Sequence, residues 1–177
     1  MIDALRRDLP NFPDEILFSW LAPAAKERGW PPTILGDGLP DSRWRALFRN
    51  KPLSAWKGIG WEKRKVQISP NSLNESSISN ISGIFEAAVL LQQNCYSEGI
   101  RDLIPRFENV IKFITTNGVL PVPPILIEEG EKFDVVDGNH RLAAFFFCHG
   151  FFKIDPPREV RERLQSIQSF WIGKPDS

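Results

Sequence analysis

The sequence predicts an α+β protein in which helices pack on a small mixed sheet, preceded by a helical, tryptophan-rich N-terminal segment. The stretch 124–136 has the pattern of two short apolar strands joined by a polar turn. The stretches 83–93 and 97–116 carry apolar residues at helical spacing. Five of the six tryptophans lie near the N-terminus, so we expect an N-terminal segment, 1–62, that packs on a main domain, 63–177.

The composition is that of an ordinary globular protein. The chain has 177 residues, of which 42% are hydrophobic, and it carries 22 basic and 22 acidic side chains. This balanced charge argues against a surface built throughout for nucleic acid. No apolar run approaches the length of about 20 residues that crosses a bilayer, and the first residues lack the apolar core of a signal peptide. We expect a cytoplasmic protein with no membrane partner.

Helix and turn signals alternate in the N-terminal segment. Asp14 and Glu15 open a helical pattern that continues to about Arg28, and Pro23 is expected to end or kink this helix. The stretch 29–41 is rich in Gly and Pro and is typical of a loop. A short helix capped by Asp41-Ser42 is expected to follow.

The middle of the chain predicts a strand, a loop and the two helices named above. Alternation over Lys65–Ser69 is typical of a strand, and the Ser- and Asn-rich stretch 69–82 is interpreted as a loop. Pro105 is expected to kink or break the second helix. Asn117-Gly118 then predicts a left-handed helix stop.

The stretch 119–150, VLPVPPILIEEGEKFDVVDGNHRLAAFFFCHG, carries the most informative pattern. It predicts strands over 124–127 and 133–136, joined by a polar turn as a hairpin. A glycine turn, Asp137–Asn139, leads into a helix from His140 that is packed through small residues. The predicted order is therefore strand, glycine turn and helix N-terminus.

Aromatic and thiol side chains make a second prediction about this helix. Phe145, Phe146 and Phe147 cannot all face one way because each helical step turns the chain by about 100°, so at least two should be buried. Cys148 is expected to be a small buried hydrophobe. Cys95 is expected to be exposed, and no neighbour of either cysteine suggests an activated thiolate.

The turn has the chemistry of an anion site. The first amides of a helix have no partner within it and carry partial positive charge, so the amides of Gly138, Asn139, His140 and Arg141 are candidate phosphate- and nucleotide-binding groups. Gly138 permits close approach of a ligand, and Arg141 offers a forked donor. His140 is a candidate proton carrier. Asp137 can hold magnesium, orient His140 or accept the proton of an attacking hydroxyl, so Asp137 and His140 are the candidate catalytic residues.

A structural role for the same residues is equally open on spacing alone. Asp-Gly is a common turn, so Asp137 can be a helix cap without any ligand. Arg141 can pair with a neighbouring carboxylate instead of a phosphate.

The same residues resemble the ParB/sulfiredoxin superfamily, whose members share a strand, a glycine-containing turn with a His-Arg or Arg-Arg pair, and a helix. The form IVDG-x-HR-x-x-A, common in ParB-like domains, appears here as VVDGNHRLAA over residues 135–144. The likeness covers about residues 98–150, and 63–98 more loosely. It implies a small mixed fold whose turn holds nucleotide phosphates, with ATP or CTP and magnesium as cofactors.

A residue-by-residue comparison with the superfamily assigns roles to some residues and argues against some of the family's activities. Gly138, His140 and Arg141 match the phosphate-binding turn, and Asp137 matches the acidic position of the kinase-like branches. Asn139 stands where sulfiredoxins have their cysteine, which argues against that reaction. The second phosphate box and the helix-turn-helix of CTP-binding segregation proteins have no counterpart, so CTP-dependent DNA clamping is not expected.

Three functions therefore compete. The first is a nucleotide-dependent phosphotransferase or NTPase assisted by magnesium. The second is a non-catalytic module that binds nucleic acid or a protein through the basic, tryptophan-rich region 43–65. The third and least favoured is a nuclease in which Asp137, with Glu128 or Glu129, holds a metal ion.

Region 43–65 has two interpretations of its own. It holds eight basic residues and one acidic residue, interleaved with the rings of Trp44, Phe48, Trp56 and Trp61. Such rings can stack on bases at a positive surface. We favour the other interpretation, a tryptophan-rich packing layer whose charged ends reach solvent, because the charges follow no sustained period.

Overall fold

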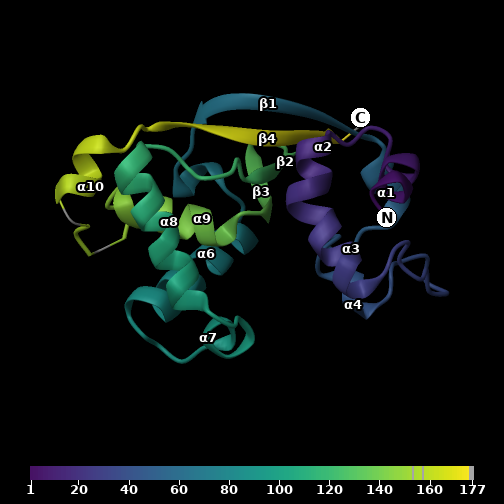
Figure 1. The fold of residues 1–177 in the computed structure, drawn as a ribbon, viewed down its shortest axis with the longest axis horizontal. Coiled ribbons are helices and arrows are strands. Elements are labelled where there is room, and N and C mark those ends of the chain that lie inside the picture. Colours follow the sequence, from purple (N-terminus) through teal and green to yellow (C-terminus); the bar gives the residue numbers. More distant parts are fainter. Residues whose placement is uncertain (153, 157, 176–177) are drawn as a thin grey trace. The chain divides into compact units, whose positions relative to one another are not determined.

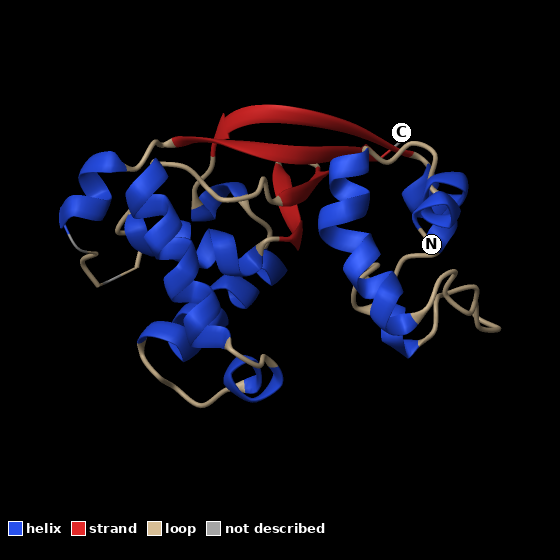
Figure 2. Ribbon diagram, viewed as in Figure 1, coloured by secondary structure: helices blue, strands red, loops and turns tan. Residues whose placement is uncertain are grey.

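The computed structural model describes residues 1–152, 154–156 and 158–175 of the chain. Their helices and four-stranded sheet confirm the predicted α+β class (Figure 2). The chain divides into two compact units. The first comprises Met1–Lys63 with the C-terminal residues from Trp171, and the second comprises Arg64–Phe170.

Figure 1 labels the elements where there is room, with helices and strands numbered in chain order. The first unit contains α1 (Ile2–Asp8), α2 (Asp14–Ile16), the π-helical η1 (Leu17–Leu21), α3 (Ala22–Arg28), α4 (Ser42–Arg45) and α5 (Leu53–Lys57). Strand β1 (Ile59–Gln67) leads out of this unit, and β4 (Ile167–Pro175) leads back into it. The second unit contains η2 (Pro70–Ser72), α6 (Glu75–Val89), α7 (Cys95–Gly99), α8 (Leu103–Asn117), β2 (Ile125–Glu129), β3 (Lys132–Asp137), α9 (Asn139–Cys148) and α10 (Arg158–Arg163). None of these described helices is long and apolar enough to cross a membrane.

The helical run expected from Asp14 to Arg28 is present as α2, η1 and α3 in succession. Pro23 does not end it, because Pro23 lies in the first turn of α3, directly after the π-helical stretch. A proline has no amide to donate, and it is tolerated where the hydrogen-bond register of the helix changes. Asp41 caps α4 as expected, accepting a hydrogen bond of 2.9 Å from the amide of Arg43.

The aromatic residues of the first unit pack on one another. Trp44, Phe48 and Trp56 have no exposed surface. The rings of Trp44 and Phe48 stack at 5.5 Å, and those of Trp20 and Trp56 lie 5.2 Å apart. These three rings of region 43–65 are therefore part of a packing layer and are not available to stack on bases. The packing of segment 1–62 on the main domain stays a prediction.

The sheet has the strand order β1-β4-β2-β3. Strands β2 and β3 form the predicted antiparallel hairpin, in which Leu126 pairs with Val135. Strand β1 begins earlier than the predicted strand at Lys65, and β4 is an element that the sequence did not predict.

Strand β4 was not predicted from the sequence because one of its buried side chains is polar. Its inward positions are Gln168, Phe170 and Ile172, which alternate along the strand. The Gln168 side chain accepts a hydrogen bond from the Leu120 amide and donates to the Gly118 and Gln165 carbonyls. These contacts satisfy a buried amide that would otherwise be costly to bury. From sequence alone, a glutamine at an inward position breaks the apolar alternation.

The Ser- and Asn-rich stretch 69–82 was wrongly predicted to be a loop, because α6 begins within it at Glu75. Asn74 caps this helix by accepting a hydrogen bond of 2.9 Å from the amide of Ser77. The Ser77 hydroxyl is buried and donates to Asp134 over 3.0 Å, and it accepts from the amide of Val135 over 2.8 Å. Tertiary contacts to β3 thus outweigh the weak local helix propensity of serine and asparagine.

The helix expected over 97–116 is two helices, α7 and α8. The break comes before Pro105, which lies in the first turn of α8, where a missing amide costs nothing. Asp102 precedes α8 in a left-handed conformation, and Gly118 ends α8 in the predicted left-handed conformation.

Helix α9 forms the centre of the second unit. It packs against α6 and α8, which lie beside it in Figure 1. The small residues Ala143 and Ala144 are fully buried on it. Phe145 and Phe146 are buried as predicted, whereas Phe147 is half-buried. Burial raises the pKa of the Cys148 thiol to about 12, which keeps it protonated and unreactive.

We predict that Ser77→Ala lowers the free energy of unfolding by about 1–3 kcal/mol. The change removes the hydroxyl that serves both Asp134 and the amide of Val135 in a buried setting. The neighbouring exposed residue provides the control, since Ser76→Ala removes a hydroxyl from the same helix turn without that contact. Urea unfolding followed by circular dichroism measures both; equal effects of the two variants would contradict the prediction.

Candidate functional site

The turn between β3 and α9 has the predicted strand, glycine and helix order. Asp137 ends β3, and Gly138 caps α9 with a φ of 103°, which favours glycine. A Cβ atom at Gly138 would lie 2.8 Å from the Cβ of Pro124. A side chain at this position would therefore disturb both the backbone and the approach of the preceding loop.

The first amides of α9 have no acceptor among the described residues. No side chain caps this helix, and the first amide to find a backbone acceptor is that of Leu142, which donates to the Gly138 carbonyl over 2.9 Å. The amides of Asn139, His140 and Arg141 precede it. These donors and the helix dipole give the start of α9 a partial positive charge.

Arg141 is held by two protein groups. Its guanidinium donates to the carboxylate of Asp137 and, over 3.0 Å, to the carbonyl of Val122. The Arg141 side chain is 15% exposed and that of Asp137 is 33% exposed. The neighbouring carboxylate considered in the structural interpretation is therefore present, and the pair brings Asp137 to the edge of the turn.

His140 and Asn139 carry buried polar atoms without partners. His140 Nε2 and Asn139 Oδ1 have no hydrogen bond among the described residues. Burial lowers the pKa of His140, and the positive charges of Arg106 and Arg141 add to this effect, whereas Asp137 opposes it. The imidazole of His140 is thus favoured in its neutral form, able to accept or donate one proton.

The carboxylates proposed for a nuclease are engaged elsewhere. Glu128 pairs with Arg64, and Glu129 accepts a hydrogen bond of 3.0 Å from the side chain of Asn74. In the described part of the chain, no three His, Cys, Asp or Glu side chains gather as a metal site would require. Asp137 itself is paired to Arg141. Magnesium at Asp137 stays a prediction.

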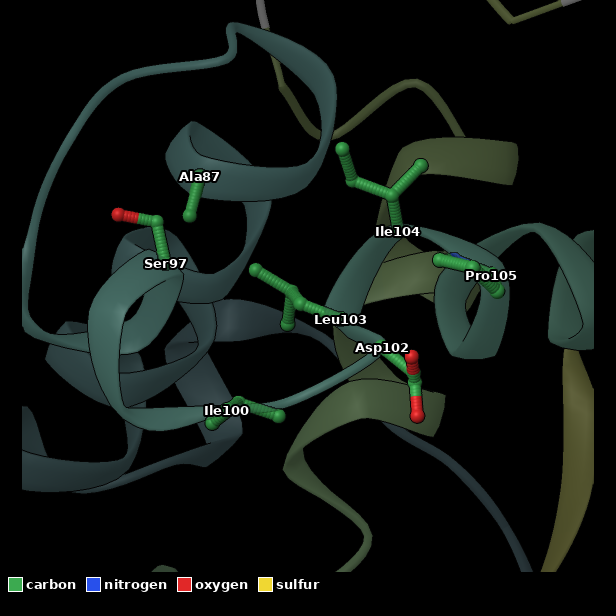
Figure 3. A pocket seen from close by; sticks show the side chains of 7 residues that line it. All are labelled: Ala87, Ser97, Ile100, Asp102, Leu103, Ile104 and Pro105. Carbon is green, nitrogen blue, oxygen red and sulfur yellow. The ribbon is translucent and has the colours of Figure 1, made fainter.

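The structure also contains a cavity that the sequence did not reveal. It has a volume of about 250 Å³ and lies between α6, α7 and α8 (Figure 3). The one sequence feature that could have indicated it is Gly83, which stands inside a helical pattern. A glycine in such a place often has a packing reason. Its partner, Tyr96, lies in a separate helix, so the signal could not be interpreted from sequence alone.

We predict that the free energy of unfolding decreases when the pH is lowered through the range in which His140 titrates. Because burial lowers the His140 pKa below its ordinary value of 6.5, the unfolded chain binds the proton more readily. The stabilising contribution is complete above pH 6.5 and is lost as the pH falls through the lowered pKa. The slope is at most about 1.4 kcal/mol per pH unit.

Urea unfolding at several pH values tests this expectation in the wild type and in His140→Gln, which should lack this part of the slope. His149→Gln is the control. Burial lowers the His149 pKa too, and a hydrogen bond to the Gln165 backbone opposes that shift, so this variant shows what a histidine outside the turn contributes to the slope. Identical pH dependence in the wild type and His140→Gln would show that His140 titrates alike in both states.

Comparisons of the chain with protein-family models, with curated proteins and with solved structures find no match. The resemblance of residues 135–144 to the ParB/sulfiredoxin superfamily therefore stays a prediction. The case for a function rests on the geometry of the turn between β3 and α9.

Proposed function

We propose that the second unit binds a phosphate group of a nucleotide, ATP or CTP, at the start of α9. The observation that carries this proposal is a helix N-terminus without a side-chain cap, whose first amides have no acceptor among the described residues. Phosphate oxygens are suitable acceptors for such amides, and the helix dipole favours their negative charge.

The side chains around the turn support the same ligand. Arg141 adds a guanidinium whose partner, Asp137, is one third exposed and can be displaced by a stronger anion. Arg106 is close enough to lower the pKa of His140, so a second positive charge lies near the turn. His140 brings a buried ring nitrogen, Nε2, that has no partner among the described residues.

Phosphoryl transfer or hydrolysis extends the proposal to an enzyme. A phosphate that binds the Arg141 guanidinium would displace the carboxylate of Asp137 from it. This carboxylate could then accept the proton of an attacking hydroxyl. The neutral ring of His140 is the alternative acceptor. Magnesium would arrive with the nucleotide, and where Asp137 serves as its protein ligand, His140 is the group left to accept the proton.

A nucleic-acid or protein partner at region 43–65 has less support. Trp44, Phe48 and Trp56 are buried, so binding there would depend on the charged ends of the basic side chains. Such contacts are weakened by salt and carry little specificity.

Asn139→Asp separates phosphate binding from a structural role of the turn. The new carboxylate stands among the first residues of α9, where negative charge favours the helix by about 0.3–1 kcal/mol. The same charge repels phosphate, so we expect nucleotide affinity to fall at least about tenfold without loss of stability. Arg141→Ala is less informative, because Arg141 also holds Asp137 and the Val122 carbonyl.

The measurement is calorimetric titration with ATP, CTP, GTP and inorganic phosphate, together with thermal unfolding of each variant. Asn71→Asp is the matched control, since it makes the same change of net charge at an exposed residue. Unchanged affinity in Asn139→Asp, or no binding of any of these compounds to the wild type, would leave the turn a purely structural element.

A further inference from the structure

The cavity between α6, α7 and α8 is separate from the residues of the phosphate proposal. Its walls are mostly aliphatic, and the residues that line it are Ala87, Ser97, Ile100, Asp102, Leu103, Ile104 and Pro105 (Figure 3). The Ser97 hydroxyl is already bonded to the Asn94 carbonyl over 2.8 Å. The pocket is open to solvent on one side and has a volume of about 250 Å³, which is room enough for a small aliphatic compound.

One wall of the cavity is a distinct segment, residues 90–102, which contains α7 and is called here the α7 segment. Near its two ends, Leu91 and Asp102 adopt left-handed backbone conformations, with φ of 54° and 60°. Such conformations are uncommon for residues other than glycine and concentrate at bends. Between them α7 has its own capping box, formed by Asn94 and Ser97. The α7 segment is thus a short capped helix between two residues in left-handed backbone conformations.

Tyr96 attaches the α7 segment to α6. Its ring covers Gly83, where a Cβ atom would collide with the ring carbons Cε2 and Cδ2. The Tyr96 hydroxyl donates to Asn80 over 2.5 Å, and the Asn94 side chain donates to the Gly83 carbonyl over 3.0 Å. A glycine inside a helix costs about 1 kcal/mol relative to alanine. Gly83 therefore weakens α6 and in return makes room for the tyrosine ring.

We propose that the α7 segment is a lid over a binding site for a small aliphatic molecule, and that Tyr96 in the notch at Gly83 is its latch. Ser97 and Ile100 come from the lid, whereas Ala87 belongs to α6 and Leu103 to α8. The site is complete only while the latch is seated. A ligand that contacts both sides stabilises the seated state, because it binds that state better than the open one.

The chain contains a single tyrosine, so labelling with 3-fluorotyrosine gives one ¹⁹F signal that reports on Tyr96 alone. Titration of the wild type with 1-hexanol is expected to shift this signal saturably and to slow amide exchange in residues 90–102. Hexane-1,6-diol, which has the same chain with a hydroxyl at each end, should bind more weakly, because five of the seven lining residues are aliphatic and its second hydroxyl must leave water to enter the site.

Gly83→Ala should displace the ring, change the ¹⁹F signal without ligand and weaken hexanol binding at least about tenfold. Gly99→Ala is the matched control, because a Cβ atom there meets nothing within 4 Å. If circular dichroism shows that Gly83→Ala does not fold, Asn80→Ala loosens the latch by removing the acceptor of the Tyr96 hydroxyl.

A wild-type signal that hexanol leaves unchanged, or that the diol shifts equally well, would overturn the proposal by itself. Hexanol binding of unaltered strength in the latch variants would overturn the role of Tyr96. Asn139→Asp should leave the hexanol titration unchanged, so the lid and the phosphate site can fail independently.

Discussion

The buried carboxylate of Asp134 constrains the arrangement of the second unit. Asp134 is 7% exposed, and it accepts hydrogen bonds from Ser77 in the first turn of α6 and from the cap residue Asn74. Because a buried charge without partners is costly, the start of α6 must lie against β3. Strand β3 ends directly before Gly138, so the strand that this polar contact holds is also the one that leads into α9.

Sequence patterns predicted the elements whose decisive signals are local. The hairpin, the glycine turn and α9 follow from short alternation, a glycine and a run of small and aromatic residues within 119–150. The start of α6 and the whole of β4 were missed for a common reason. Ser77 and Gln168 are polar residues at buried positions, and their partners, Asp134 and Gly118, lie about fifty residues away in the chain. No local pattern contains those partners.

In the candidate site, too, the features with local signals could be predicted, whereas the contacts with distant residues could not. The residues from Asp137 to Arg141 could be placed on a strand, a turn and a helix start because they are consecutive. Sequence did not predict that Arg141 also bonds the Val122 carbonyl, or that Arg106 of α8 acts on His140. The first effect comes from the loop before β2 and the second from α8. The chemistry at a turn therefore depends on neighbours that its own motif does not specify.

The position of β4 in the sheet has a consequence for how the protein is made. The strand lies between β1 and β2, although it follows the other three strands in the chain. During synthesis, β1 emerges from the ribosome about a hundred residues before its neighbour in the sheet exists. Until then the facing edges of β1 and β2 present unpaired backbone groups, which invite pairing with other chains. In the nascent protein, these backbone groups stay unpaired until β4 has been synthesised and enters the sheet.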